Sequence, residues 1–175
     1  MDIEFNAFEV FEIAEKIERN GARFYRRAAE LFDDAGTSKM FIELANWEAK
    51  HIDVFANMRK QLSELSRELR TFKPENNILA DAQAMAGLAV FGIKPDPSDE
   101  LSGKESKVDV LKKAIEKEKD SIVYYTGLKE FVAARAGKDK IDDIIKEEMH
   151  HISILSQSLQ QREQLEARSP ATFGT

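Results

Sequence analysis

The chain has 175 residues, a formal net charge of −6, 33% charged residues and 42% hydrophobic residues. This composition predicts a soluble helical protein of one domain; it excludes wholesale disorder, and an acidic balance excludes the basic footprint of a nucleic-acid-binding protein. The chain has no cysteine, which excludes disulfides, iron–sulfur clusters and thiolate metal sites, so any metal must be held by carboxylate and imidazole groups.

Neither a membrane nor a secretory route is expected. The first residues, Met1 to Phe5, are acidic and lack the charged and apolar regions of a signal peptide. No apolar run approaches the roughly 20 residues that a spanning helix needs. The expected location is therefore the cytoplasm.

The first two helix signals form one pair. A stripe of apolar residues at helical spacing predicts a helix over about residues 6–33, and a second stripe predicts one over about 38–69. Gly36 suits the position just after the first helix, and Thr37 suits the N-cap of the second. The short turn between them predicts an antiparallel hairpin.

The last two helix signals form a second pair. Ser106 and Asp109 have the spacing of a capping box, which predicts a helix start at about Lys107. This helix is expected over about 107–135 and the next over about 139–166, with Gly137 marking the break between them. All four prolines lie outside the four helical stretches.

A long connection joins the two hairpins. We expect a single domain over residues 1–169, with a repeat of 6–69 in 106–167, a crossover at 70–105 and a tail at 170–175. The apolar stretch 78–91 predicts a short helix in the crossover, because a structureless loop of this length is uncommon. Its apolar residues suggest either a homodimer contact or a cap on the bundle end: Ile78, Leu79, Met85, Leu88, Val90 and Phe91.

The second hairpin repeats the first at an offset of 100 residues without a gap. Polar residues recur on both apolar stripes, where they need an explanation: Glu18 with Glu118, Glu48 with Glu148, and His51 with His151. One helix of each pair thus carries an inward Glu and the other carries Glu-x-x-His. A Glu from each of two helices with Glu-x-x-His from the other two is the ligand set of di-iron and di-manganese bundles.

Charge supports the same interpretation. Four buried carboxylates would be costly or would stay protonated, whereas two divalent cations balance them. Glu48 and Glu148 are expected to bridge the metals, since each shares a helix face with one His. Glu18 and Glu118 are then terminal ligands. Oxygen and imidazole ligands suit iron, and manganese or zinc are also possible.

His150 offers a competing frame, because Glu147 and His150 also have the spacing Glu-x-x-His. The apolar residues of this helix share a face with Glu148 and His151, so we interpret His150 as a surface residue.

Tyr25 and Tyr125 lie two turns beyond Glu18 and Glu118 and lean back toward the metal layer. They are either core tyrosines or donors to a ligand carboxylate. The other aromatics, Trp47, Phe24 and Tyr124, are interpreted as core or interface residues.

These motifs resemble the rubrerythrin-like branch of the ferritin-like superfamily. The resemblance rests on residues 17–25, 44–51, 114–125 and 145–151 and covers about Glu9 to Leu159. It implies an all-α, ferritin-like four-helix bundle of two antiparallel hairpins joined by a long crossover, and a non-haem di-iron centre that reacts with peroxide or dioxygen. Rubrerythrins also carry a cysteine-ligated rubredoxin site, which this chain lacks, and an extra carboxylate ligand where Ser121 stands here. The six-ligand set is equally similar to a bacterioferritin ferroxidase centre.

The leading hypothesis is a di-iron oxidoreductase with a role in oxidative stress, which reduces hydrogen peroxide or dioxygen with electrons from an external donor. No catalytic residue is needed beyond the metal ligands. One alternative is a ferroxidase or iron-binding protein without turnover, and another is a bundle with a purely structural metal site.

Overall fold

The computed structural model describes residues 7–68, 100–132 and 137–168 of the chain. Within these ranges it forms four helices, α1 (Ala7–Glu30), α2 (Ala35–Glu68), α4 (Lys107–Phe131) and α5 (Lys138–Arg168). The expected all-α fold is confirmed, and no described helix is long and apolar enough to cross a membrane. The expected crossover helix and its apolar residues lie outside the described residues, so the dimer hypothesis stays a prediction.

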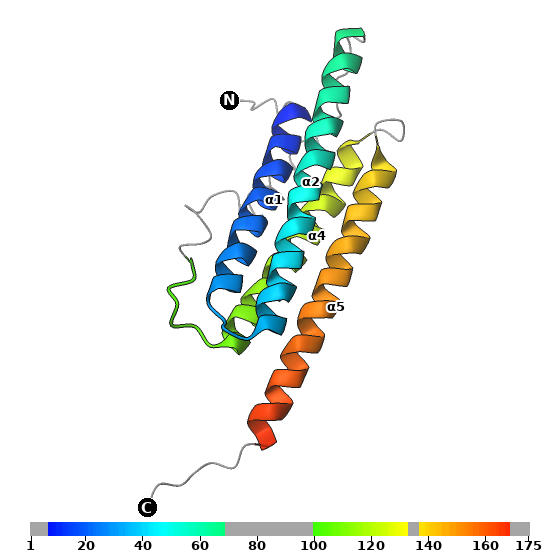
Figure 1. Cartoon of the computed structure of the whole chain (residues 1–175). Helices are drawn as coiled ribbons and strands as arrows, with labels where there is room; N and C mark the ends of the chain where they lie inside the picture. Colours follow the sequence, from blue (N-terminus) through cyan, green and yellow to red (C-terminus); the bar gives the residue numbers. More distant parts are fainter. Residues whose placement is uncertain (1–6, 69–99, 133–136, 169–175) are drawn as a thin grey trace, which may run out of the picture.

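The helices form two antiparallel hairpins that lie side by side (Figure 1). Helix α1 packs along α2, and α4 packs along α5, with fewer contacts between the hairpins. Since α1 also lies beside α4, and α2 beside α5, each helix runs antiparallel to both neighbours (Figure 1). This arrangement brings the inner stripes of all four helices to one central axis.

Two local signals set the ends of the hairpins. The capping box of Ser106 and Asp109 is present at the start of α4, as expected. Gly137 adopts φ 99° immediately before α5, a conformation that glycine adopts without a Cβ clash. The expected N-cap of the second helix was wrong, because α2 begins at Ala35 and Thr37 donates its backbone N–H to Asp34 Oδ1 at 2.9 Å. Asp34 therefore caps α2, since its carboxylate is the stronger acceptor.

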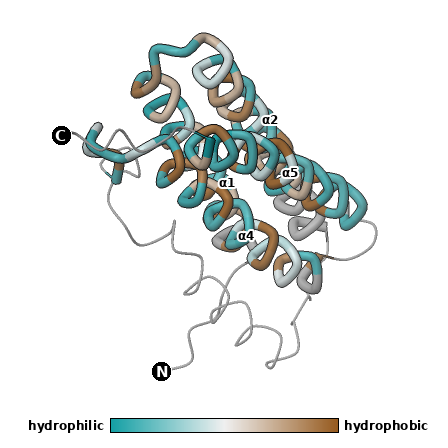
Figure 2. The backbone as a smooth tube through the Cα atoms, turned by 90° about the horizontal axis from the view of Figure 1, so that it is seen from below, coloured by the Kyte–Doolittle hydropathy of each residue, from teal (hydrophilic) through white to brown (hydrophobic). Residues whose placement is uncertain are grey.

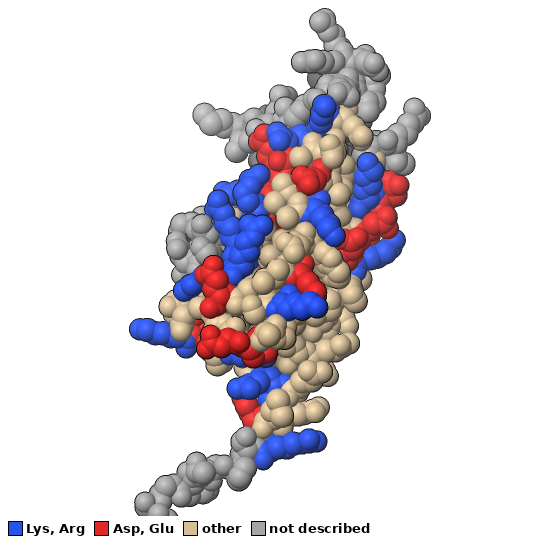
Figure 3. Space-filling model, in the orientation of Figure 1, with Lys and Arg blue, Asp and Glu red and all other residues tan. Residues whose placement is uncertain are grey.

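The core consists of two apolar clusters at opposite ends of the bundle. One cluster contains Phe11, Phe55 and Ile141, and the other contains Phe24, Phe41 and Leu111. Seen nearly end-on, hydrophobic and hydrophilic residues alternate along every helix (Figure 2). Charged side chains of both signs are spread over the outer face (Figure 3). Between the two clusters lies a buried polar layer.

Candidate metal centre

The polar layer contains all six residues singled out in the sequence. Each helix supplies one glutamate to this layer, because these positions share the apolar stripe that faces the central axis. Helices α2 and α5 also supply a buried histidine one turn later. None of the six is more than 5% exposed: Glu18, Glu48, His51, Glu118, Glu148 and His151.

The six side chains divide into two overlapping groups. Position 1 combines Glu18 and His51 with Glu48 and Glu148, and position 2 combines Glu118 and His151 with the same two glutamates. Within each group, one possible ligand atom from each residue lies within 4.8 Å of the others. Glu48 and Glu148 thus belong to both positions, which is the arrangement expected of bridging carboxylates, whereas Glu18 and Glu118 each belong to one. Metal ligation by the six residues stays a prediction.

Both histidines turn the same ring nitrogen toward the carboxylates. His51 Nδ1 lies 3.3 Å from Glu18 Oε2 and 3.1 Å from Glu148 Oε1. His151 Nδ1 lies 2.9 Å from Glu148 Oε2 and 3.4 Å from Glu118 Oε1. In each position, one nitrogen and several carboxylate oxygens therefore converge on a common point.

Several of these buried atoms make no hydrogen bond of good geometry among the described residues, although the Glu148 oxygens and His151 Nδ1 lie at ion-pair distance from a partner. They are Glu48 Oε1, both carboxylate oxygens of Glu148, and both ring nitrogens of His151. Leaving a buried polar atom unpaired costs about 1–3 kcal/mol, and more for a charged group. Five such atoms in one layer indicate that the ion pairs alone do not complete the contacts of these groups. Divalent cations would satisfy the oxygens and the Nδ1 atom, so the residues present fit a pair of metal ions.

The carboxyl groups also respond to the crowding of negative charge. Burial first, and then the charge of Glu148, raise the pKa of Glu118 to about 8. Burial likewise raises the pKa of Glu48 well above its ordinary value, with the charges of Glu18 and Glu118 adding to the effect. The pKa of Glu18 is raised for the same two reasons, burial first and then the charge of Glu148. The layer therefore favours positive charge, whether protons or metal ions supply it.

The histidines show the complementary shift. Burial on its own lowers the pKa of His51, but hydrogen bonding and charge from Glu148 and Glu18 outweigh it and raise the pKa to about 12. The pKa of His151 is also raised to about 12, because Glu118, Glu148 and Glu48 outweigh its burial. Imidazolium groups thus offset part of the carboxylate charge when metal is absent, and metal ions would replace their protons.

Two tyrosines connect the polar layer to the apolar clusters. Tyr25 on α1 donates its phenolic hydrogen to Glu118 Oε1, and Tyr125 on α4 donates to Glu18 Oε1. Each phenol therefore bonds the glutamate of the other hairpin. Of the two interpretations left open for these tyrosines, the geometry supports donation to the candidate ligands, and both rings are also packed in the core.

A small hollow lies against the layer on the side of α1 and α4. Its lining includes Gly21, Glu48, Glu118 and Ser121, and it has room for one water molecule. A Cβ added at Gly21 would lie 3.0 Å from Glu48 Oε2. Glycine at this position therefore gives the Glu48 carboxylate room to lie against the α1 backbone.

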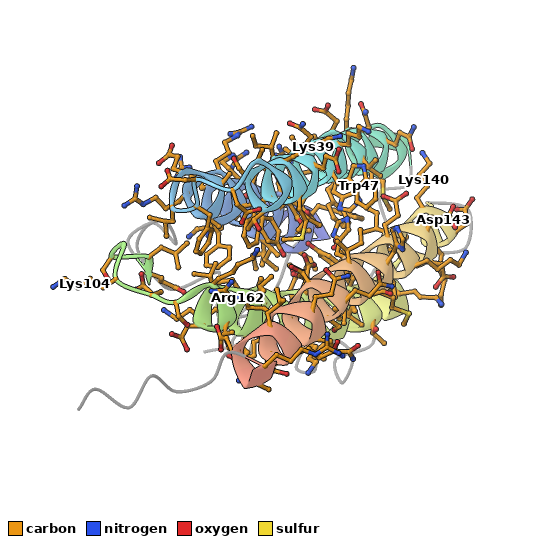
Figure 4. All side chains as sticks on the ribbon, turned by 60° about the horizontal axis from the view of Figure 1, so that its bottom comes forward. Lys39, Trp47, Lys104, Lys140, Asp143 and Arg162 are labelled. Atoms are coloured by element: carbon orange, nitrogen blue, oxygen red, sulfur yellow. The ribbon has the colours of Figure 1, made fainter. Side chains whose placement is uncertain are left out.

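The exposed side of the centre lies between α2 and α5. His150 is exposed, as the phase of α5 predicted. Trp47, labelled in Figure 4, is partly buried on the side of α2 that faces α5. Its ring stacks on His151 at a centroid distance of 4.7 Å and also contacts the His150 ring at 5.7 Å. This position is consistent with the interpretation of Trp47 as a core or interface aromatic.

The contact between Glu147 and His51 was not expected from the sequence. Glu147 Oε2 lies 2.7 Å from Nε2 of His51, although the Glu147 side chain is 57% exposed. Glu147 precedes Glu148, so it points about 100° away from the inner stripe, toward α2. Finding this contact from sequence requires the relative rotation of α2 and α5, which helical periodicity does not give.

A comparison with solved structures supports the fold. The chain is similar to a candidate ferritin-like diiron-carboxylate protein from Thermotoga maritima, whose crystal structure superposes with a TM-score of 0.71 at 26% sequence identity. The match covers 93% of this chain and 99% of that chain. No protein-family profile and no curated protein matches the sequence. The chain thus has a ferritin-like bundle fold, and its buried carboxylate and histidine cluster fits the binding of two metal ions such as iron.

Proposed function

We propose that the protein is a rubrerythrin-like di-iron oxidoreductase that reduces hydrogen peroxide or dioxygen with electrons from an external donor. The observation that carries the proposal is the sharing of Glu48 and Glu148 between two otherwise separate ligand groups. A site for a single metal ion would not require two such ligand groups. The similar Thermotoga maritima protein, described as a diiron-carboxylate protein, supports iron as the metal.

The protein side of the chemistry is orientation, charge compensation and exclusion of water. Iron ions would supply redox equivalents and Lewis acidity at the two positions. The carboxylates would hold them, while the phenols of Tyr25 and Tyr125 fix the orientation of Glu118 and Glu18. Apolar clusters above and below the layer keep bulk water away.

The size of the hollow beside Gly21 supports a small oxidant. It touches Glu48 and Glu118, one glutamate from each hairpin, and has room for about one water molecule. Hydrogen peroxide and dioxygen have one heavy atom more than water, whereas a larger organic substrate would need a larger pocket. Reduction of one hydrogen peroxide to two water molecules takes two electrons and two protons. Two ferrous ions bound in the layer would supply the two electrons. An external donor would restore them directly, because the chain has no cysteine for a rubredoxin-type relay centre.

Ser121 favours a second candidate function, oxidation of iron by a ferroxidase or iron-binding protein whose centre is not reduced again by an external donor. This residue lines the hollow at the position where rubrerythrins carry an additional carboxylate ligand. With serine there, the described residues of the layer provide six candidate ligands, as in the bacterioferritin-like ferroxidase centre that the sequence also resembles. In this case the oxidised metal would be passed on or stored rather than reduced again.

One experiment tests the proposal and separates the two candidates. The full chain is loaded anaerobically with two equivalents of ferrous iron and mixed with hydrogen peroxide or dioxygen in a stopped-flow spectrometer. We expect rapid oxidation of both ions, arrest after one stoichiometric event, and renewed consumption of oxidant when a reductase system is added. Iron retained through many cycles supports the oxidoreductase.

Two other results would contradict it. Iron released after oxidation, or repeated oxidation that depends on fresh ferrous iron, supports the ferroxidase. Loaded, reduced protein that stays unchanged for minutes with both oxidants indicates a purely structural metal site. Native mass adds a second criterion, because a storage function requires a shell of many subunits.

A further inference from the structure

The two halves of the centre differ at one pair of equivalent residues. At the 100-residue offset, Glu147 on α5 corresponds to Trp47 on α2, and each immediately precedes a shared glutamate. Each also faces the histidine of the opposite helix. Glu147 presents a carboxylate oxygen to His51, whereas Trp47 presents the face of its ring to His151. The two halves therefore differ in the residue that contacts each histidine on the side away from the other candidate ligands.

This difference determines how each imidazole is held. His51 turns Nδ1 toward Glu18 and Glu148 and Nε2 toward Glu147, 2.7 Å away, so that its outer N–H has a carboxylate acceptor. His151 also turns Nδ1 inward, but its Nε2 has no hydrogen-bond partner among the described residues. The indole of Trp47 packs on that ring at an interplanar angle of 19° and offers no acceptor atom.

A carboxylate on the outer nitrogen affects a metal-binding histidine in two ways. It fixes the tautomer that leaves the inner nitrogen free to bind metal, and it makes the imidazole a stronger donor. Stacking by an aromatic ring limits ring rotation but supplies neither effect. The side chain of Glu147 is 57% exposed, so solvent weakens its charge, but the short contact with the buried His51 remains.

We propose that Glu147 is a positioning residue for His51 and makes the two metal positions unequal, so that position 1 fills first and binds more tightly than position 2. This inference rests on the proposed dinuclear site and adds an order of filling to it. It concerns how metal binds, and it does not depend on the oxidant or on turnover.

The test is a calorimetric titration of metal-free, full-length protein with Mn²⁺ or, under anaerobic conditions, with Fe²⁺. The unmodified protein should bind in two steps of distinct affinity. Glu147→Ala should weaken the tighter step by about 10- to 100-fold and leave the weaker step unchanged. The affinity of the tighter step in Glu147→Gln should lie between those of the unmodified protein and Glu147→Ala. The glutamine amide oxygen still accepts the His51 N–H but carries no charge.

Glu163→Gln is the matched control. Glu163 lies on the exposed outer part of α5, pairs with Lys112 at 3.6 Å and is remote from the centre. Its replacement removes the same charge from the same helix and should leave both steps unchanged. Circular dichroism of each metal-free variant checks that the bundle is intact.

A second measurement needs no variant. Protein loaded with one equivalent of ⁵⁷Fe²⁺ should show mainly one Mössbauer doublet, and a distinct second doublet should grow as the second equivalent is added. Two equal, independent binding steps, or no change on replacing Glu147, would overturn this inference and leave the proposed function intact. Failure of the unmodified protein to bind metal would overturn both.

Discussion

Tyr25 on α1 bonds Glu118 on α4, and the reciprocal bond joins Tyr125 to Glu18. Each tyrosine ring packs in an apolar cluster, and its hydroxyl donates to a carboxylate of the opposite hairpin. The two bonds thus connect the hairpins directly through the candidate metal layer.

We expect Tyr25→Phe and Tyr125→Phe each to destabilise the metal-free protein by about 1–3 kcal/mol, because a buried carboxylate loses its donor. Both variants should still bind two metals, with weaker affinity, and should react with oxidant more slowly. Thermal unfolding and calorimetric titration measure these effects. Tyr124→Phe is the control, because the Tyr124 hydroxyl donates to the backbone oxygen of Val10 at 2.8 Å. It should cost stability without changing metal affinity, and an equal loss of affinity in all three variants would contradict the assigned contacts.

The shared glutamates should matter most for metal binding. Glu48→Ala and Glu148→Ala each remove a residue that belongs to both positions, so we expect loss of most binding at both. Glu18→Ala and Glu118→Ala should each mainly affect one position. Metal content after dialysis, measured by mass spectrometry, checks the stoichiometry.

His150→Ala provides the control for this series. Its imidazole is exposed outside the layer, so the variant should keep two metals per chain. Loss of metal in His150→Ala would indicate that Glu147 and His150, rather than Glu148 and His151, are the metal ligands on α5. Full occupancy in the Glu48 and Glu148 double variant would refute the bridging assignment.

Gly21→Ala should separate stability from metal binding. Alanine favours a helix over glycine by about 1 kcal/mol, so the metal-free variant should be as stable as the parent or more so. Its new Cβ would lie 3.0 Å from Glu48 Oε2 and 3.1 Å from Cδ, so the carboxylate must shift. Metal affinity should therefore fall. Ser121→Ala, at the equivalent position of the second hairpin, removes a hydroxyl without adding bulk and should bind metal normally. A stable Gly21→Ala protein with unchanged affinity would show that Glu48 adapts freely.

Asp34 should contribute stability that depends on pH. Hydrogen bonds from Thr37, followed by that from Lys107, lower the pKa of this exposed carboxyl to about 2 from 3.8. A lowered folded-state pKa means that the contribution is complete above about pH 4 and is lost as the pH falls through 2. Asp34→Asn keeps a neutral cap and should lower the melting temperature at pH 7 by about 1–3 °C, with a smaller difference near pH 3. Thermal unfolding from pH 7 to pH 3 measures the difference. Asp33→Asn, at the adjacent exposed residue, is the control, and an effect that stays constant with pH would contradict the role of the charge.

The sequence predicted those features that depend on position along one helix. The phase of α5 placed Glu148 inside and His150 outside, and the structure agrees. The spacing of Ser106 and Asp109 located the start of α4 correctly. Helical periodicity is sufficient for such features because each is decided by its own segment.

Contacts between helices were beyond the reach of periodicity. It indicated that Tyr25 leans toward the layer but not that its acceptor is Glu118 on α4. It also gave no reason to pair Glu147 with His51, since that contact depends on how α2 and α5 are rotated about their axes. The start of α2 was misplaced because Asp34 and Thr37 are both good capping residues, and their competition is decided by the geometry of the turn.

The reciprocal tyrosine bonds have the form of an isologous interface, in which residue i of one copy contacts residue j of the other and j contacts i. Tyr25 to Glu118 and Tyr125 to Glu18 are the same contact made twice across a pseudo-twofold axis. The bundle can therefore be regarded as a dimer of two similar, though not identical, helical hairpins joined into one chain. A single hairpin supplies only one of the two shared glutamates to each metal position. Expressed alone, it would bind metal only by associating with a second copy, with an affinity that depends on protein concentration. In the full chain the covalent link replaces that concentration dependence with a fixed, high effective concentration of the second half.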